Sequence, residues 1–226
     1  MIVSIVGAHG QIARLLTAKL AARGHSVRGL VRSEDQFDDL RSDGAEPVLC
    51  DVEAAGQDAD DGPDEIDRAL DGSDIVVFAA GSGPGSGAER KQTMDRDGAI
   101  ASLRSAVRVG ADRFVMISAM GADDPPLGVR GDDDDVFDVY LRAKAAADDA
   151  VREAEIAETI VRPGRLTDDE PAGSVELGTS VGRGEIPRAD VAEVVAQLVE
   201  TGRGRGATFE LVGGALPIVD AILTLE

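Results

Sequence analysis

The chain has 226 residues, a length that suits one α/β domain with a continuous core. Its 43 acidic and 23 basic residues give a net charge of −20, so binding to nucleic acid is not expected from a surface that repels phosphate backbones. Aromatic residues make up only 3%, which excludes extensive base stacking, whereas a hydrophobic fraction of 43% argues against disorder.

Short runs rich in β-branched residues predict six strands, and apolar residues at helical spacing lie between them. Repeated alternation of strand and helix predicts parallel strands joined by right-handed crossovers. The fold class expected is therefore α/β, a doubly wound parallel sheet in three αβα layers. The predicted strands are, in chain order, Ile2–Val6, Val27–Val31, Pro47–Cys50, Ile75–Ala80, Phe114–Ser118 and Thr159–Val161.

Three segments rich in Gly, Pro or Asp are predicted to be loops: Gly56–Asp64, Gly81–Arg90 and Gly121–Asp135. The second and third follow strands, at the edge where open α/β sheets bind ligands. The segment of residues at about 164–188 is expected to be irregular in structure and to form a small wall of the pocket on the substrate side. No change of composition marks a boundary, so residues 1–226 are expected to form a single domain.

Cys50 is the single cysteine, so no internal disulfide and no Cys/His zinc site can form, and no metal site is predicted. No apolar run approaches the length of a membrane span. We therefore expect a cytoplasmic protein without a membrane partner. Asp outnumbers Glu, and the lysines number three against a large excess of Arg, which suggests adaptation to a salty cytoplasm where self-repulsion is screened. The alternative is an acidic mesophilic protein.

A glycine loop follows the first predicted strand and precedes an amphipathic helix. Its spacing is G-x-x-G-x-x-A, ending at Ala13, and it is typical of a turn whose backbone approaches a diphosphate at a helix N-terminus. An ordinary glycine-bearing turn is the alternative. The loop residues expected to contact a dinucleotide are Gly7, His9, Gly10, Gln11 and Ile12.

Arg32 at the end of the second strand favours NADP over NAD, because an Arg there accommodates a 2′-phosphate, whereas Glu34 or Asp35 would favour ribose hydroxyls. Alternatively, Arg32 pairs with a neighbouring carboxylate. Asp51 and Val52 are expected beside the adenine, although Asp51 could instead cap a turn. Three residues at the carboxyl end of the fourth strand are also expected to contact the cofactor: Ala79, Ala80 and Gly81.

Tyr140, the only tyrosine, and Lys144 lie four residues apart in a helix predicted over Val136–Ala154, so both project from one face. An ammonium beside a phenol lowers the pKa of the phenol, which suits a proton donor or acceptor for a carbonyl or alcohol. Ser118, at the end of the fifth strand, could bind the same substrate oxygen. The alternatives are a solvated helix surface and an ordinary turn serine.

Several segments together resemble the atypical short-chain dehydrogenase/reductases, specifically the small NAD(P)H-binding epimerase-like subgroup: VGAHGQIA, RFVMISAMGA, YLRAK, TIVRPGRLTDDEPAG and IPRADVAEVV. The resemblance implies a Rossmann fold, NADP as the usual ligand, and Ser118, Tyr140 and Lys144 as catalytic residues, with Lys144 also holding the nicotinamide ribose. It places Asp97 where relatives carry an Asn, and Pro163 near the nicotinamide, although Pro163 could simply end a strand.

The leading hypothesis is an NADP-dependent oxidoreductase, or an epimerase using the same hydride chemistry, acting on a small carbonyl or alcohol. One alternative is a redox-sensing NAD(P)H-binding regulator without turnover, and another is a flavin or quinone reductase that needs no tyrosine. The expected partner is a small-molecule substrate. Helices near Ala99–Val109 and Val136–Ala154 are candidates for a homodimer interface.

Overall fold

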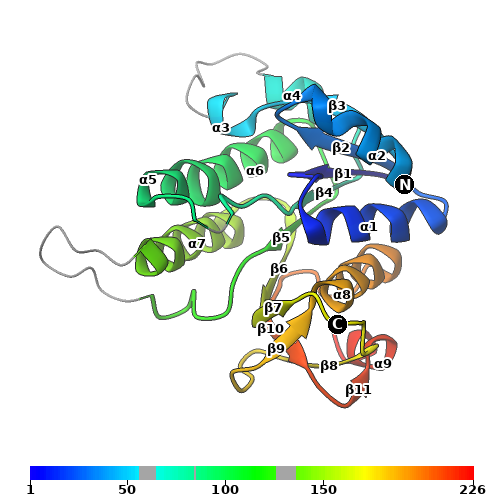
Figure 1. The fold of residues 1–226 in the computed structure, drawn as a ribbon, viewed down its shortest axis with the longest axis vertical. Helices are drawn as coiled ribbons and strands as arrows, with labels where there is room; N and C mark the ends of the chain where they lie inside the picture. Colours follow the sequence, from blue (N-terminus) through cyan, green and yellow to red (C-terminus); the bar gives the residue numbers. More distant parts are fainter. Residues whose placement is uncertain (56–64, 84, 126–135) are drawn as a thin grey trace, which may run out of the picture.

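The computed structural model describes residues 1–55, 65–83, 85–125 and 136–226. Its strands are β1 (Ile2–Val6), β2 (Ser26–Val31), β3 (Ala45–Leu49), β4 (Ile75–Phe78), β5 (Arg113–Ile117), β6 (Ala157–Pro163), β7 (Arg165–Thr167), β8 (Ser174–Gly178), β9 (Glu185–Pro187), β10 (Ala207–Gly213) and β11 (Leu216–Pro217). Nine of them form one sheet in the order β11-β8-β10-β6-β5-β4-β1-β2-β3 (Figure 1).

The six predicted strands are all present, and their ends agree with β1 to β6 to within two residues. These strands pair in parallel, as does β10 with β6. Every residue of β4 and β5 is buried, because helices cover both faces of the sheet. Pro47 is tolerated because β3 is an edge strand. The predicted doubly wound α/β fold is confirmed.

Helices form a layer on each face of the sheet (Figure 1). They are α1 (Gln11–Ala22), η1 (Glu34–Gln36), α2 (Phe37–Asp43), α3 (Val52–Ala55), α4 (Glu65–Leu70), α5 (Ala88–Arg90), the π-helical η2 (Lys91–Gly98), α6 (Ala99–Arg108), α7 (Val136–Glu153), α8 (Arg188–Thr201) and α9 (Ile218–Leu223). One layer contains α1, α8 and α9, and the other contains α4, α6 and α7. The homodimer expected through α6 and α7 stays a prediction.

The spacing of apolar residues along α1 explains how this helix packs within its layer. Ala13, Leu16 and Leu20 form a buried stripe along α1, and this helix packs beside α8. None of the helices in the described part of the chain combines the length and the apolar character that a membrane span requires.

The segment at about 164–188 differs from its prediction. It contains the short strands β7, β8 and β9, and β8 joins the main sheet antiparallel to β10. Gly164 and Gly184 make this arrangement close-packed, since a side chain at Gly164 would run into the Gly184 carbonyl. The strands β7, β8 and β9 contain at most one buried residue each, so no apolar run marks them in the sequence.

The structure describes only part of the three predicted loops. Gly81–Arg90 is a loop up to Ala88, where α5 begins, apart from position 84, which lies outside the described residues. The segment 56–64, and residues 126–135 of the third predicted loop, also lie outside the described residues.

Candidate active site

A groove of two adjoining cavities lies at the carboxyl ends of the central strands. The first, of about 280 Å³, adjoins the ends of β1 and β2, and the second, of about 790 Å³, lies between the loop after β4, the end of β5 and α7. The sheet reverses its strand order between β1 and β4, the position where open α/β sheets bind ligands. Both cavities are lined by Ala79, Ala80, Gly81 and Ser82.

The turn between β1 and α1 has the shape of an anion-binding loop. Gly7 has a φ of 77°, and a Cβ there would lie 2.5 Å from Cα of Ala80. A Cβ at Gly10 would come within 3.3 Å of the Gly7 carbonyl. The first turn of α1 has no acidic residue, so the positive end of the helix dipole is not neutralised there. These features fit the diphosphate of a dinucleotide.

The other three residues predicted to contact the dinucleotide from this loop line three different cavities. His9 lines the first cavity, and its Nε2 lies 2.8 Å from Oδ2 of Asp39. Ile12 lines the second cavity. Gln11 instead lines a separate hollow between α1 and residues 167–171, so the structure does not bring it into the groove.

Arg32 lines the first cavity, is exposed, and forms no ion pair with any residue in the described ranges. Arg14 behaves differently, because its Nε lies 2.6 Å from Oδ2 of Asp43. A guanidinium without a carboxylate partner in an acidic protein fits the 2′-phosphate of NADP.

Asp51 and Val52 also line the first cavity. Oδ1 of Asp51 accepts hydrogen bonds from the backbone N–H groups of Glu53 and Ala54, at 3.1 and 3.3 Å, so Asp51 caps α3 as the alternative interpretation suggested. Sequence reasoning missed Arg90, which lines this cavity and whose Nε lies 3.2 Å from Oε2 of Glu53.

Tyr140 and Lys144 line the second cavity together with Ser118 and Pro163. Lys144 is 3% exposed, and its Nζ lies 3.3 Å from Oδ1 of Asp95 and 5.8 Å from the centroid of the Tyr140 ring. The buried Ser118 also lies close enough to the Asp148 carboxylate to oppose the rise of its pKa. The structure thus brings together the Ser, Tyr and Lys expected from the sequence, and their catalytic roles stay a prediction.

The pKa of Tyr140 is raised, whereas the sequence predicted that Lys144 would lower it. Burial raises the pKa of Tyr140 above its ordinary value, and the charges of Asp95 and Asp148 act in the same direction, so they outweigh Lys144, which opposes them. Burial alone would lower the pKa of Lys144, but Tyr140 and the two carboxylates reverse the direction and raise it. At neutral pH the pair is a neutral phenol beside an ammonium.

Asp97 does not lie in either cavity, and its Oδ1 is 2.6 Å from Nε of the adjacent Arg96. The buried carboxylate at this place is Asp95, which contacts Lys144 and accepts hydrogen bonds from the backbone N–H and the hydroxyl of Ser82, at 3.2 and 2.6 Å. The sequence carried no signal that distinguishes Asp95, because η2 is π-helical and α-helical spacing does not hold through it.

A second buried ion pair supports the cavity from behind. Nε of Arg162 lies 2.8 Å from Oδ2 of Asp148, and Arg162 also contacts Asp123. Burial raises the pKa of Asp148, while Ser118 and Arg162 oppose this. The pair fixes α7 against the end of β6, where Pro163 lines the cavity. Sequence reasoning missed Asp148, although it lies four residues after Lys144, just as Lys144 lies four residues after Tyr140.

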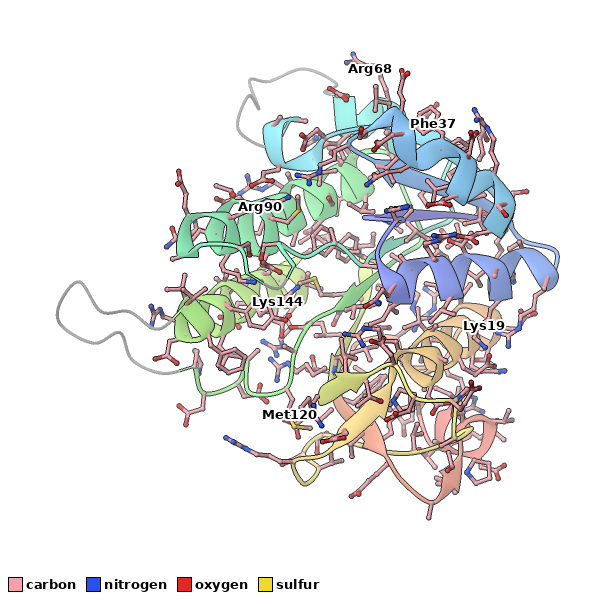
Figure 2. All side chains as sticks on the ribbon, viewed as in Figure 1. Lys19, Phe37, Arg68, Arg90, Met120 and Lys144 are labelled. Carbon is pink, nitrogen blue, oxygen red and sulfur yellow. The ribbon has the colours of Figure 1, made fainter. Side chains whose placement is uncertain are left out.

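Lys91 in η2 also lines the second cavity and was missed. Its Nζ donates a hydrogen bond to the Gly83 carbonyl at 3.0 Å and lies 5.0 Å from the centroid of the Tyr140 ring. Two of the three lysines of the chain therefore line this cavity. Figure 2 places Lys144 on the side of the sheet covered by α6 and α7, and Lys19 on α1 on the other side. The scarcity of lysine in the sequence was the signal that could have identified Lys91 as a candidate site residue.

The fold and the groove define an α/β protein that binds a dinucleotide at the switch point of its sheet. A family model described as NAD(P)H-binding matches residues 7–201, and the chain belongs to this family. Within it, the chain is an atypical short-chain dehydrogenase/reductase of the epimerase-like subgroup, as the sequence motifs indicated.

Relatives agree with this placement. A Bacillus subtilis protein described as an uncharacterized sugar epimerase, YhfK, is 33% identical over 226 residues, which cover 100% of both chains. A solved Bacillus halodurans structure, described as a candidate NAD-dependent epimerase/dehydratase, is 37% identical, covers 100% of both chains and has a TM-score of 0.87. A Veillonella parvula short-chain dehydrogenase/reductase in complex with NADP is similar in fold alone, with 15% identity, 96% coverage of both chains and a TM-score of 0.71.

Proposed function

We propose that residues 1–226 form a single domain that acts as an NADP-dependent oxidoreductase, or as an epimerase with the same chemistry, on a small carbonyl or alcohol. The observation that supports this most strongly is the position of the nearly buried Lys144. It lies beside Tyr140, in a cavity that is also lined by Ser118 and that adjoins the anion-binding glycine loop.

The residues divide the work on a carbonyl substrate. The buried Ser118 hydroxyl, which lines the cavity, donates a hydrogen bond to the substrate oxygen and orients it. Tyr140 transfers its phenolic proton to the same oxygen, so that its O–H bond breaks as the new O–H bond forms. The raised pKa keeps Tyr140 protonated and ready to donate. Lys144 stabilises the phenolate that remains. When bound, NADPH supplies the hydride for the carbonyl carbon.

The groove supports NADP rather than NAD as the dinucleotide. The backbone at Gly7 and Gly10 would hold the diphosphate, and Arg32, which has no ion pair with a described residue, would bind the 2′-phosphate. Asp95 acts as a positioning residue, because it holds the Lys144 ammonium beside Tyr140.

The test compares Tyr140→Phe with the native protein in the reduction of a panel of small carbonyl compounds by NADPH, in molar KCl. Removing the proton donor is expected to lower kcat by about 10²- to 10⁴-fold while NADPH affinity stays the same. Asp149→Asn, an exposed change on the same helix, is the matched control and should leave kcat unchanged.

Two results would contradict the proposal and identify an alternative. Unchanged reduction of a flavin or quinone by Tyr140→Phe would indicate direct hydride transfer without an acid. Tight NADPH binding without turnover of any carbonyl or alcohol would favour a redox-sensing role.

A further inference from the structure

Lys91 stands out because most cations around the groove have carboxylate partners. Lys144 contacts Asp95, and Arg90 contacts Glu53. Lys91 has no carboxylate within ion-pair distance among the residues described, and its Nζ bonds the neutral carbonyl of Gly83. An ammonium that lines a cavity and lacks a counter-ion is available to an anionic ligand.

The surroundings of Lys91 make such a ligand favourable. Its side chain is only partly exposed, and burial lowers the pKa of Lys91, as do the nearby charges of Lys144 and Arg90, whereas Asp95 acts in the opposite direction. Its partners are a neutral carbonyl and an aromatic ring, which compensate a partly buried charge less well than a carboxylate does. A carboxylate delivered by a ligand would provide that partner and a charge-assisted hydrogen bond.

The rest of the cavity suits an apolar body. Val136 and Phe137 of α7 line the cavity and are 41% and 59% exposed, so large apolar side chains meet solvent there. Leu166 and Pro163 line it as well. Apolar walls with a few convergent polar groups are the usual composition of a small-molecule site.

We propose that this cavity takes an oxo or hydroxy carboxylic acid with an apolar body, and that Lys91 binds its carboxylate. The assignment rests on the proposed function, because Tyr140 and Ser118 receive the reacting oxygen. Nζ of Lys91 is 5.0 Å from the centroid of the Tyr140 ring. Hydrogen bonds to both groups therefore fit one molecule whose carboxylate and reacting oxygen are only a few bonds apart. Lys91 is thus a specificity-determining residue.

The experiment compares two probes that differ in one group, 4-methyl-2-oxopentanoate and 4-methylpentan-2-one, which has a methyl group in place of the carboxylate. Calorimetric titration measures the affinity of each probe for the protein with and without saturating NADP⁺, at one fixed KCl concentration. The variants are Lys91→Met, which removes the charge, and Lys91→Arg, which keeps it. Lys19→Met, which removes a lysine paired with Glu193 outside the groove, is the control. Each variant is also titrated with NADPH.

The native protein, Lys91→Arg and the control are expected to bind the oxo acid at least about tenfold more tightly than the ketone. Lys91→Met should lose this preference while keeping its affinity for the ketone and for NADPH. No preference in the native protein, a preference that survives in Lys91→Met, or binding of neither probe would overturn the assignment. A loss of NADPH affinity in Lys91→Met would assign Lys91 to the cofactor instead. Failure of the native protein to bind NADPH would contradict the proposed function, and the titrations without NADP⁺ would still test Lys91.

Discussion

Replacing Asp95 by Asn is expected to destabilise the protein far more than the same change at Asp97, two residues away. The Asp95 side chain is 1% exposed, its Oδ1 lies 3.3 Å from Nζ of Lys144, and its Oδ2 accepts two hydrogen bonds from Ser82. Neutralising it leaves the Lys144 ammonium buried without its partner, and breaking a buried pair from one side costs about 3–5 kcal/mol. The Asp97–Arg96 pair is about two-fifths exposed, and such pairs contribute about 0–1 kcal/mol.

Urea denaturation followed by circular dichroism, at one KCl concentration, measures the free energy of unfolding of both variants. Asp95→Asn should lose about 3–5 kcal/mol, and Asp97→Asn less than about 1 kcal/mol. The double variant Asp95→Asn with Lys144→Met should regain part of the loss, since the unpaired charge is then absent. Equal losses at the two aspartates, or a loss below about 1 kcal/mol at Asp95, would refute the buried pair.

Three further predictions concern the cofactor loop, the ribose site and the phenol. Arg32→Gln should lower the ratio of NADPH to NADH affinity by about tenfold or more, because a charge-assisted hydrogen bond is lost, whereas Arg41→Gln should not change it. Ultraviolet titration of the ligand-free protein reports Tyr140 alone, since it is the only tyrosine and Trp is absent. The inflection should lie above pH 10, because burial raises the pKa of Tyr140. The protonated phenol therefore contributes to the stability of the fold below about pH 10, and this contribution is lost as the pH rises through the pKa of the folded state. Gly7→Ala should abolish the thermal stabilisation by NADPH, whereas Gly24→Ala, at a left-handed glycine with open space around it, should keep it.

Each of these predictions has a contradicting result. An unchanged dinucleotide preference in the Arg32 variant would remove that side chain from the ribose site. A phenol inflection below pH 10 would mean that Lys144 outweighs burial at Tyr140. Full NADPH stabilisation of the Gly7 variant would place the diphosphate elsewhere.

Local patterns made much of the fold predictable from sequence. The strands β1 to β6 are apolar runs bounded by turn residues, and the loop containing Gly7 and Gly10 follows the first of them directly. Tyr140 and Lys144 were expected on one helical face because α-helical spacing alone fixes that relation. These features depend on neighbours within a few residues, so they can be read without the tertiary structure.

Features that depend on distant contacts were not predictable. The direction of the Tyr140 pKa is set by its burial and by Asp95 and Asp148, which come from two different helices. Asp95 rather than Asp97 faces the cavity because η2 packs beside α7, and nothing near either residue in the sequence distinguishes them. Lys91 reaches the Gly83 carbonyl and the Tyr140 ring only when η2 packs beside α7.

A crystal structure of the protein with NADPH, grown at high KCl, tests the central claim most directly. We expect the diphosphate on the backbone N–H groups that begin at Gly10, the 2′-phosphate at Arg32, and the nicotinamide in the cavity that holds Tyr140 and Lys144. A dinucleotide bound outside this groove, or a Tyr140 hydroxyl turned away from the nicotinamide, would contradict the account.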